Sequence, residues 1–96
     1  MIQSFRDETA ADSFQERNTR ATRRIPQALW RGVQRKLKPV DAASRLDDLL
    51  VPAGNRLEAL TGDRKGQFSI RINQQYRICF RWMEHGADEV EILDYH

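Results

Sequence analysis

Residues 68–82 read Phe-Ser-Ile-Arg-Ile-Asn-Gln-Gln-Tyr-Arg-Ile-Cys-Phe-Arg-Trp, and this stretch decides the fold. Apolar and polar residues alternate on both sides of the tripeptide 73–75, which is the pattern of half-buried strands. A three-residue loop at 73–75 pairs Ile70 with Ile78 and places all the apolar residues on one face. A two-residue loop would mix the faces, because a slip of one residue turns every side chain over. The sequence therefore predicts an antiparallel hairpin with one apolar face.

The opposite face of this hairpin carries arginines. In the same register Arg71 pairs with Arg77, and Arg81 lies further along the same strand. Like charges directly opposite each other on a sheet are destabilising. We therefore expect this face to bind an anion. The alternative is three exposed arginines that lie apart in water.

The N-terminal half of the chain predicts helices. Asp7 is a typical N-cap for a helix from about Glu8 to Arg17. Pro26 is typical of the first turn of a second helix, and Pro39 is expected to end it. Between the two prolines the apolar residues recur at helical spacing: Leu29, Trp30, Val33 and Leu37. A further helical turn is expected over residues 43–50.

The remaining elements set the fold class. Residues 2–5 and 57–60 are short candidate strands, and a last strand over 90–95 follows a turn at 85–88. This order of a strand, two to three helices and then four strands predicts an α+β fold, with the helices on one face of a small antiparallel sheet. A length of 96 residues predicts one domain over residues 1–96.

Composition excludes several classes of protein. The single cysteine, Cys79, excludes an internal disulfide, and one cysteine with two histidines argues against a structural zinc site. No apolar run approaches the roughly 18 residues that a membrane span needs. Residues 1–7 lack the apolar segment of a signal peptide. We therefore expect a cytoplasmic protein with no membrane partner.

Charge is unevenly distributed along the chain, although the formal net charge is only +2. Residues 56–81 carry six basic and two acidic side chains, whereas residues 84–94 carry five acids and no lysine or arginine. Residues 17–38 contain no acid and eight basic side chains: Arg17, Arg20, Arg23, Arg24, Arg31, Arg35, Lys36 and Lys38. Such segments are typical either of a surface that binds a polyanion or of a solvated helix face.

Two further stretches are candidates for chemistry. The loop over residues 62–66 lacks the spacing of a P-loop, but its Arg64 and Lys65 can contact a nucleic-acid backbone. The triplet Asp94-Tyr95-His96 directly follows the last expected strand. A terminal histidine is often a disordered end or the remnant of a tag. Here the α-carboxylate is expected to favour the protonated imidazole, and a histidine that titrates near neutrality can transfer protons.

These residue types fit one reaction. Metal-free RNA cleavage needs a base for the 2′-OH, an acid for the leaving 5′-oxygen and positive charge on the phosphate. Arginine suits the last role because its planar fork matches phosphate oxygens. Histidine or tyrosine can serve the first two. No Ser-His-Asp set, Cys-His pair or two-carboxylate site offers a competing chemistry.

Three stretches of the sequence match the motifs of a known family. Residues 56–70 read Arg-Leu-Glu-Ala-Leu-Thr-Gly-Asp-Arg-Lys-Gly-Gln-Phe-Ser-Ile, residues 76–80 read Tyr-Arg-Ile-Cys-Phe, and residues 94–96 read Asp-Tyr-His. In this order they resemble the segment Leu-His-Pro-Leu-Lys-Gly-Asp-Arg-x-Gly-x-Trp-Ser-Ile, the segment Trp-Arg-Ile-Thr-Phe and the Asp-Tyr-His ending of HigB-type toxins of the RelE superfamily, from type II toxin–antitoxin systems. The opening residues also match. The resemblance covers essentially the whole chain.

The resemblance implies a RelE-like fold and a ribosome-dependent mRNA endonuclease that inhibits translation and growth without a metal or other cofactor. It implies a HigA-like helix-turn-helix antitoxin as partner, with operator DNA bound only through the antitoxin complex. By carry-over, Arg77 is the phosphate-binding arginine, and Asp94, Tyr95 and His96 are active-site residues. From their charge and position we expect RNA contacts from Arg31, Arg35, Lys36, Arg64, Lys65, Arg71 and Arg81.

The chain also departs from the family pattern. Glu58 stands where many relatives have histidine, Thr61 where they have lysine, and Asn73 where they have a further basic residue. Arg71 is the residue expected to compensate. The Leu-Glu-Ala-Leu sequence is closest to a GraT-like subgroup, for which weaker toxicity or an altered role is an alternative. Two other functions stay open: a ribosome- or RNA-binding module with weak or no catalysis, and an interaction protein whose basic helices bind an acidic partner.

Overall fold

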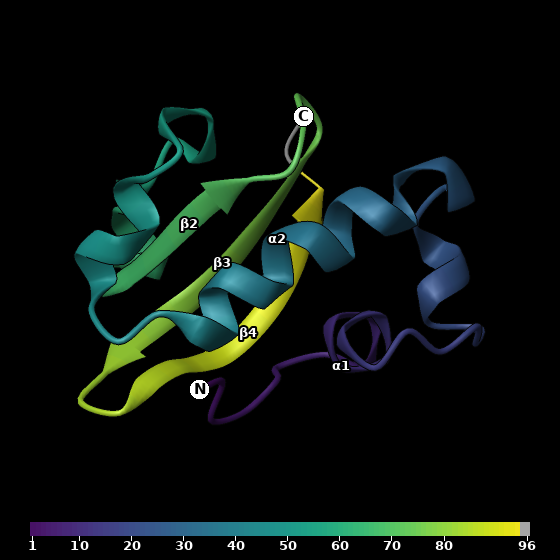
Figure 1. The fold of residues 1–96 in the computed structure, drawn as a ribbon, viewed down its shortest axis with the longest axis horizontal. Helices are drawn as coiled ribbons and strands as arrows, with labels where there is room; N and C mark the ends of the chain where they lie inside the picture. The colour runs from purple at the N-terminus through teal and green to yellow at the C-terminus, as the bar shows by residue number, and fades with distance from the viewer. Residues whose placement is uncertain (95–96) are drawn as a thin grey trace.

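The computed structural model describes residues 1–94, which form an α+β fold. Helices α1 (Glu8–Phe14) and α2 (Trp30–Ala42) precede the sheet in the sequence. The four antiparallel strands lie in the order β1 (Glu58–Ala59), β2 (Gln67–Arg71), β3 (Tyr76–Met83) and β4 (Gly86–Asp94). Helix α2 crosses one face of the sheet and α1 lies beside β4 (Figure 1). The predicted fold class is confirmed.

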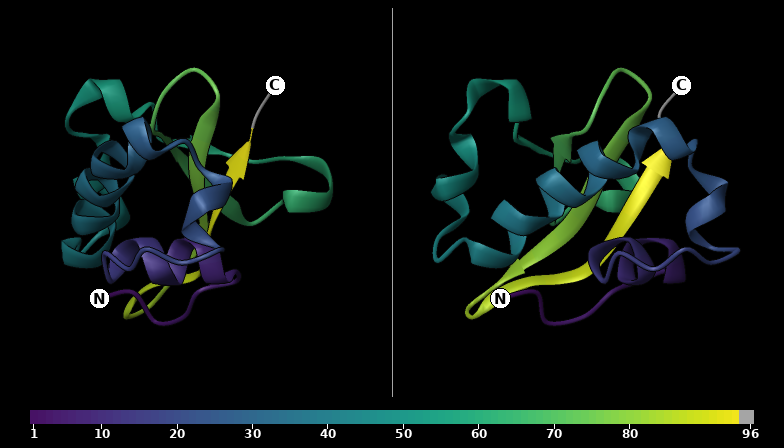
Figure 2. Two further views of the ribbon diagram at one scale, coloured as in Figure 1. Left: turned by 90° about the vertical axis from the view of Figure 1, so that its right-hand side faces the viewer. Right: turned by 45° about the vertical axis from the view of Figure 1, so that its right-hand side comes forward.

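Short 3₁₀ turns connect these elements. They are η1 (Thr22–Arg24), η2 (Gln27–Leu29), η3 (Leu46–Leu50), η4 (Ala53–Asn55) and η5 (Gly62–Arg64). The loop that contains η5 projects from the side of the sheet opposite α2 (Figure 2, left). Helix α2 and this loop therefore lie on opposite sides of the sheet.

The hairpin of β2 and β3 has the register that the alternation predicts. Ile70 lies opposite Ile78, and Arg71 lies opposite Arg77. The loop over residues 73–75 is closed by a hydrogen bond from the Ile72 amide to the Tyr76 carbonyl, 3.0 Å long. The predicted three-residue loop and its single apolar face are confirmed, and both arginines lie on the face that α2 leaves uncovered.

The hydrophobic core forms between α2 and the apolar face of the sheet. The helix contributes Val33, Leu37 and Val40, whose spacing of four and three residues puts them on one side of the helix. They pack in a cluster with Ile78 and Phe80, and all five are fully buried. Each such side chain contributes about 1.5–3 kcal/mol of hydrophobic stabilisation. This packing fixes the sheet under the helix and leaves the arginine face outside.

The end of α2 differs from the prediction. Pro39 lies inside the helix, which continues to Ala42. A proline in a helix interior removes one hydrogen bond and costs about 3 kcal/mol. The two residues that follow the apolar stripe, Val40 and Ala43, are buried against the core and offset this cost. The prediction that Pro39 ends the helix was therefore wrong, because burial of the next turn outweighs the local preference.

The bounds of other helices and strands also differ from those predicted. Helix α1 ends at Phe14 rather than Arg17, and Glu16 has a positive φ of 57°, which no helix accommodates. Residues 27–29 form a 3₁₀ turn ahead of α2, and the helical turn predicted over residues 43–50 is a 3₁₀ turn over residues 46–50. The last strand starts at Gly86 instead of residue 90. Its predicted end at Tyr95 lies outside the described residues.

The N-terminal segment lies along β4 but forms no regular strand. Phe5 makes a single parallel bridge with Val90, in place of the strand predicted over residues 2–5. The segment is held at its start by the Ile2 amide, which donates to an Asp41 carboxylate oxygen at 2.8 Å. Gly86 permits this path, because a Cβ at that position would lie 2.0 Å from the Met1 carbonyl oxygen. No helix within residues 1–94 is long and apolar enough to span a bilayer.

Candidate functional site

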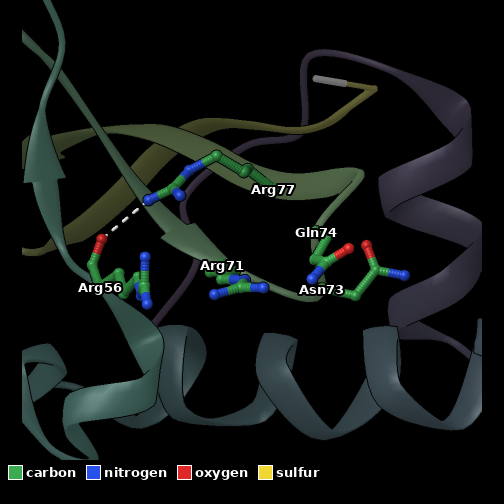
Figure 3. Close-up of a pocket in the computed structure, with 5 residues that line it drawn as sticks. All are labelled: Arg56, Arg71, Asn73, Gln74 and Arg77. Carbon is green, nitrogen blue, oxygen red and sulfur yellow. Dashed lines mark hydrogen bonds between the residues drawn. The ribbon is translucent and has the colours of Figure 1, made fainter. Parts of the chain in front are cut away.

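An open pocket of about 270 Å³ lies at the end of the sheet where β2 stops and β3 begins. The residues that line it are Arg56, Arg71, Asn73, Gln74 and Arg77 (Figure 3). Three of them are arginines, and none of them is acidic. Such a concentration of guanidinium groups is a site for a phosphate or a carboxylate. The facing arginines that the sequence predicts thus lie in one pocket.

Arg77 is held in place by its neighbours. Its Nε donates to the Ser69 hydroxyl at 2.8 Å. Its Nη2 donates to the Arg56 carbonyl, also at 2.8 Å, and Figure 3 shows this second bond. Ser69 is fully buried in the middle of β2. These bonds fix the plane of the guanidinium before any ligand arrives, so less side-chain entropy is lost on binding.

Arg71 lies opposite Arg77 in the ladder and is half-buried. Its guanidinium forms no hydrogen bond or ion pair with another residue of the described chain. Two positive groups directly opposite each other repel, and an anion between them removes that repulsion. The geometry of this pair therefore favours an anionic ligand.

Arg81 and Arg64, which the sequence also assigns to RNA binding, are ion-paired within the protein. The Arg81 Nε lies 2.8 Å from a Glu89 carboxylate oxygen. The Arg64 Nη1 lies 3.2 Å from a carboxylate oxygen of Glu91, which is only 7% exposed. Both arginines are thus part of the internal electrostatics of the sheet. Lys65, next to Arg64, is exposed to solvent.

The basic residues of α2 also differ in whether they are exposed or hydrogen-bonded within the protein. Arg31 and Arg35 are exposed. The Lys36 ammonium donates to the side-chain oxygen of Asn55, which is buried. The Asn55 Nδ2 in turn donates to the Leu49 carbonyl at 3.2 Å. Lys36 therefore holds η4 against the helix, whereas the two arginines and Lys38, which is also exposed, present their charge to solvent.

Cys79 does not supply a nucleophile. It lies on the arginine face but is fully buried, opposite Glu91 in β4. Burial, the largest cause, together with the Glu91 carboxylate raises the pKa of the Cys79 thiol to about 11. A thiol with this pKa is almost wholly protonated at neutral pH and is a poor nucleophile.

The end of β4 lies next to the arginine pocket. Asp94 pairs with Tyr76 across the ladder and accepts a hydrogen bond from Gln75 Nε2 at 3.1 Å. Its neighbour Leu93 lies directly opposite Arg77. The last strand therefore carries the chain towards the hairpin loop that borders the pocket. Tyr95 and His96, the other members of the predicted triplet, lie outside the described residues.

Two residues that the sequence reasoning did not assign to the site belong beside it. Arg56 contributes both its carbonyl and its side chain to the pocket. Ser69 supplies the hydroxyl that holds Arg77. The place of Ser69 opposite Glu58 and next to the facing arginines could have indicated it, because all of these lie on one sheet face. No sequence signal indicates the backbone role of Arg56.

Residues 1–94 contain no cluster of three or more metal-binding side chains. The expectation of a metal-free reaction is not tested by this finding and stays a prediction.

The sequence of the chain is similar to proteins of a known family. The profile of HigB-like toxins, described as the RelE-like toxin of the type II toxin–antitoxin system HigB, matches residues 3–96. Toxin HigB-1 of Vibrio cholerae serotype O1 is 42% identical over 88% of this chain and 86% of its own length. An uncharacterized protein of Haemophilus influenzae is 32% identical over 96% and 88% of the two chains.

A solved structure has the same fold. The chain superposes on the YoeB–YefM complex from Staphylococcus aureus with a TM-score of 0.61 and 16% identity, over 100% of this chain and 98% of the other. At this identity the likeness concerns the fold alone. The family model and Toxin HigB-1 confirm the resemblance that three sequence motifs indicate, although the assignment to a GraT-like subgroup stays a prediction. The chain belongs to the HigB-like toxins, the RelE-like toxins of type II toxin–antitoxin systems.

Proposed function

We propose that this toxin is a ribosome-dependent mRNA endonuclease that a HigA-like helix-turn-helix antitoxin neutralises. The observation that carries the proposal is the arginine pocket, in which Arg77 is held by hydrogen bonds to Ser69 and Arg56 and lies opposite Arg71, which forms no hydrogen bond or ion pair within residues 1–94. A pre-oriented guanidinium in a pocket without a lining carboxylate is suited to a phosphate whose charge increases during reaction. Membership in the HigB-like toxins supports RNA as the carrier of that phosphate.

The reaction follows from the chemistry of RNA. The ribose 2′-oxygen attacks the adjacent phosphorus, the bond from phosphorus to the 5′-oxygen breaks, and the products carry a 2′,3′-cyclic phosphate and a 5′-hydroxyl. The pentacovalent transition state is more negative than the substrate at its phosphoryl oxygens. Arg77, assisted by Arg71, stabilises that added charge, which is the difference that accelerates a reaction.

We assign proton transfer to the C-terminal triplet Asp94-Tyr95-His96. His96, supported by Tyr95 and Asp94, takes the proton of the 2′-OH or returns one to the leaving 5′-oxygen. Asp94 lies at the end of β4, beside the hairpin loop that borders the pocket. If His96 is dispensable, the role passes to Tyr95 or to Glu58, which is exposed and pairs with Ser69 at the start of the sheet.

Binding to the ribosome uses other charges. Arg31, Arg35 and Lys65 are exposed and are expected to contact ribosomal RNA phosphates without sequence preference. The antitoxin would bind the toxin in a cytoplasmic complex, and operator DNA would be bound only through that complex. The toxin domain is proposed to span residues 1–96.

The test is cleavage of an mRNA on programmed ribosomes. Purified toxin is expected to cut the translated mRNA and to leave a 5′-hydroxyl end. The matched control is the same mRNA with one 2′-deoxy nucleotide at the mapped position, which cannot supply the nucleophile and should stay intact. Cleavage of the deoxy substrate at the normal rate would rule out the proposed reaction.

A second function is favoured by a specific departure. Glu58 replaces the histidine of many relatives, and Arg64 and Arg81 are ion-paired, so this chain has fewer groups at hand for catalysis. The alternative is a binding module that occupies the ribosome without efficient cleavage. A chain that inhibits translation at a stoichiometric ratio but leaves the mRNA whole would establish this alternative.

A further inference from the structure

Residues 61–66 connect β1 to β2, and we call them the η5 loop. The base of this loop is closed by a hydrogen bond from the Leu60 amide to the Gln67 carbonyl, 2.9 Å long. The loop projects from the sheet on the side opposite α2 (Figure 2, left). Within residues 1–94, only the side chain of Arg64 connects the η5 loop to the rest of the protein by hydrogen bonds or an ion pair. The position of the loop therefore depends on one side chain.

The Arg64 side chain reaches across one strand of the sheet. Its Nη1 donates to Gln67 Oε1 at 3.1 Å and to Glu91 Oε2 at 3.2 Å. Glu91 belongs to β4, and β3 lies between β4 and the strand β2 that follows the loop. The β3 residue directly opposite Glu91 is Cys79. The guanidinium therefore lies over the part of β3 that contains Cys79.

The environment of the Cys79 thiol agrees with such a cover. The thiol is fully buried, although it lies on the sheet face opposite α2. Burial raises the pKa of the Cys79 thiol to about 11, and the Arg64 charge is the largest influence in the opposite direction. Such an influence requires a short distance between the guanidinium and the sulfur. The accessibility of Cys79 thus indicates whether Arg64 is in place.

The ion pair between Arg64 and Glu91 can break at a low cost. The Glu91 side chain is only 9% exposed, whereas the Arg64 side chain is 33% exposed. Arg6, from the N-terminal segment, has its Nε 3.5 Å from the same Glu91 oxygen. If Arg64 withdraws, Arg6 still neutralises the carboxylate, so that no buried charge is left without a partner. The withdrawn guanidinium is hydrated, which offsets part of the lost attraction.

Glycines at both ends permit the η5 loop to turn. Gly62 has a φ of 63° and Gly66 has a φ of 94°. Glycine adopts positive and negative φ about equally readily, so the backbone can rotate at both points with little strain. Between them the η5 turn is closed by its own hydrogen bonds, one of which runs from the Lys65 amide to the Gly62 carbonyl at 3.1 Å. The loop can therefore move as one short unit.

We propose that the η5 loop is a strap across β3, that the Arg64–Glu91 ion pair is its latch, and that Glu91 is the positioning residue that sets the place of Lys65. In the closed state the ion pair is formed and Arg64 covers Cys79. In the open state the pair is broken and solvent reaches the thiol. The role of Lys65 rests on the proposed function, in which this exposed residue contacts ribosomal RNA, whereas the strap itself does not.

The experiment uses Cys79, the single cysteine of the chain, as the reporter. The rate at which iodoacetamide alkylates the native toxin is divided by the rate for the urea-unfolded toxin. This ratio measures how often the strap opens. The reaction is followed by mass spectrometry at about pH 8.5, near the ordinary pKa of a thiol. Raising the salt concentration from about 0.05 M to 0.5 M should raise the wild-type ratio about threefold, because salt screens a partly exposed ion pair.

Arg64→Gln is the decisive variant, because it removes the latch and leaves Glu91 paired with Arg6. It should raise the alkylation ratio about tenfold. Loss of a positive charge near the thiol would by itself slow the reaction, so an acceleration reports the opening. The ratio of this variant should no longer depend on salt, and Arg64→Lys should restore part of the protection. Arg6→Gln is the matched control: it removes the other partner of Glu91, outside the loop, and should not raise the ratio.

The positioning role of Glu91 is tested on programmed ribosomes. Glu91 is only 7% exposed, so it acts on a ribosome through its neighbours. Glu91→Gln should raise the KM for ribosomes about threefold and leave kcat unchanged, since a displaced Lys65 loses one phosphate contact. A merely structural role would instead reduce the amount of folded toxin and so lower kcat.

Three results would decide the matter. An alkylation ratio that stays at the wild-type value in an Arg64→Gln protein with a native melting transition would overturn the strap. A ratio that rises with urea as steeply as global unfolding does would also overturn it. An unchanged KM in a Glu91→Gln toxin that cleaves mRNA would overturn the positioning role. If Arg64→Gln accelerates alkylation but the wild-type toxin cleaves no mRNA, the strap stands and the endonuclease function fails.

Discussion

Arg71 and Arg77 lie at one end of the sheet face that α2 leaves uncovered, and Arg64 and Arg81 lie towards the other. The second pair is neutralised within the protein, since each has a glutamate oxygen within 3.2 Å. The first pair lies in a pocket that no carboxylate lines. The same residue type on one sheet face thus has two roles, and the position of the glutamates decides which.

The two pairs of arginines also contribute differently to the stability of the fold. An arginine beside a glutamate stabilises the fold modestly and has little attraction left for a ligand. Two arginines that face each other on a sheet repel, and a bound anion reduces that repulsion. The end with Arg71 and Arg77 is therefore where we expect an anion to bind, and variants at the two ends should behave differently.

The largest effect is expected from Arg77→Ala compared with Arg81→Ala. Loss of Arg77 removes stabilisation that is made in the transition state, and should slow single-turnover cleavage of ribosome-bound mRNA on the order of 100-fold or more. Arg81→Ala should slow it by only about a few fold, because Glu89 already neutralises Arg81. Equal effects of the two variants, in proteins with native melting transitions, would contradict the division between the two ends.

The next effect concerns stability at the paired end. Glu91→Ala leaves the partly exposed Arg64 and Arg6, whose Nε lies 3.5 Å from the same carboxylate, without their buried partner. The free energy of unfolding should fall by about 1–2 kcal/mol, less than for a fully buried pair because both arginines reach water. Urea denaturation measures this change.

Glu89→Ala is the matched control for that experiment. Glu89 is exposed to nearly half its area, and its ion pair with Arg81 lies at the surface. A change of less than about 1 kcal/mol is expected. A larger loss in Glu89→Ala than in Glu91→Ala would show that the buried carboxylate is not what holds this end together.

A smaller effect is expected from the exposed charges of α2. Replacing Arg31 and Arg35 by Gln should reduce the slope of log affinity for the ribosome against log salt by roughly 1–2 units, since each lost phosphate contact removes close to one. The single variant Lys36→Gln should change the slope less and lower the melting temperature more, because Lys36 binds Asn55. An unchanged slope in the double variant would assign Arg31 and Arg35 to the antitoxin or to solubility.

Part of this site could be predicted from the sequence because it depends on local pattern. The alternation around residues 73–75 allows only one loop length that keeps the apolar residues on one face, so the opposition of Arg71 and Arg77 follows. The alternation also places Arg81 on their face. The resemblance to the family motifs over residues 56–80 also assigns the phosphate contact to Arg77, and this assignment stays a prediction.

The rest could not be predicted, because it depends on residues far apart in the chain. Arg64 and Glu91 are 27 residues apart, and no period connects them. The left-handed conformation of Arg56 is set by the contacts of η4 and not by its own preference. Pro39 breaks the local rule for helices because Val40 and Ala43 are buried. In each case tertiary contacts outweigh local propensity.

The smallest effect is expected from the Asp7 carboxylate, which lies near the Glu91 carboxylate. The test is whether its negative charge lowers the stability of the fold. Asp7 caps α1 by accepting from the Ala10 amide at 2.7 Å, and it lies near Glu91. Burial, the main cause, and repulsion from Glu91 raise the pKa of Asp7 above its ordinary 3.8. A carboxyl whose pKa rises on folding costs nothing when both states are protonated. The cost develops as the pH rises through 3.8 and is complete above the folded pKa.

Asp7→Asn removes this cost and keeps the cap, since asparagine is an equally good N-cap. The variant should match the wild type in stability at pH 3 and exceed it at pH 7 by less than about 1 kcal/mol. Glu8→Gln, at the exposed position next to the cap, is the control, and there the difference should be smaller at either pH. Urea denaturation of the three proteins between pH 3 and pH 7 gives the differences. A wild type that instead gains stability over Asp7→Asn as the pH rises would show that the attraction of the carboxylate to the helix amides outweighs its burial and its repulsion from Glu91.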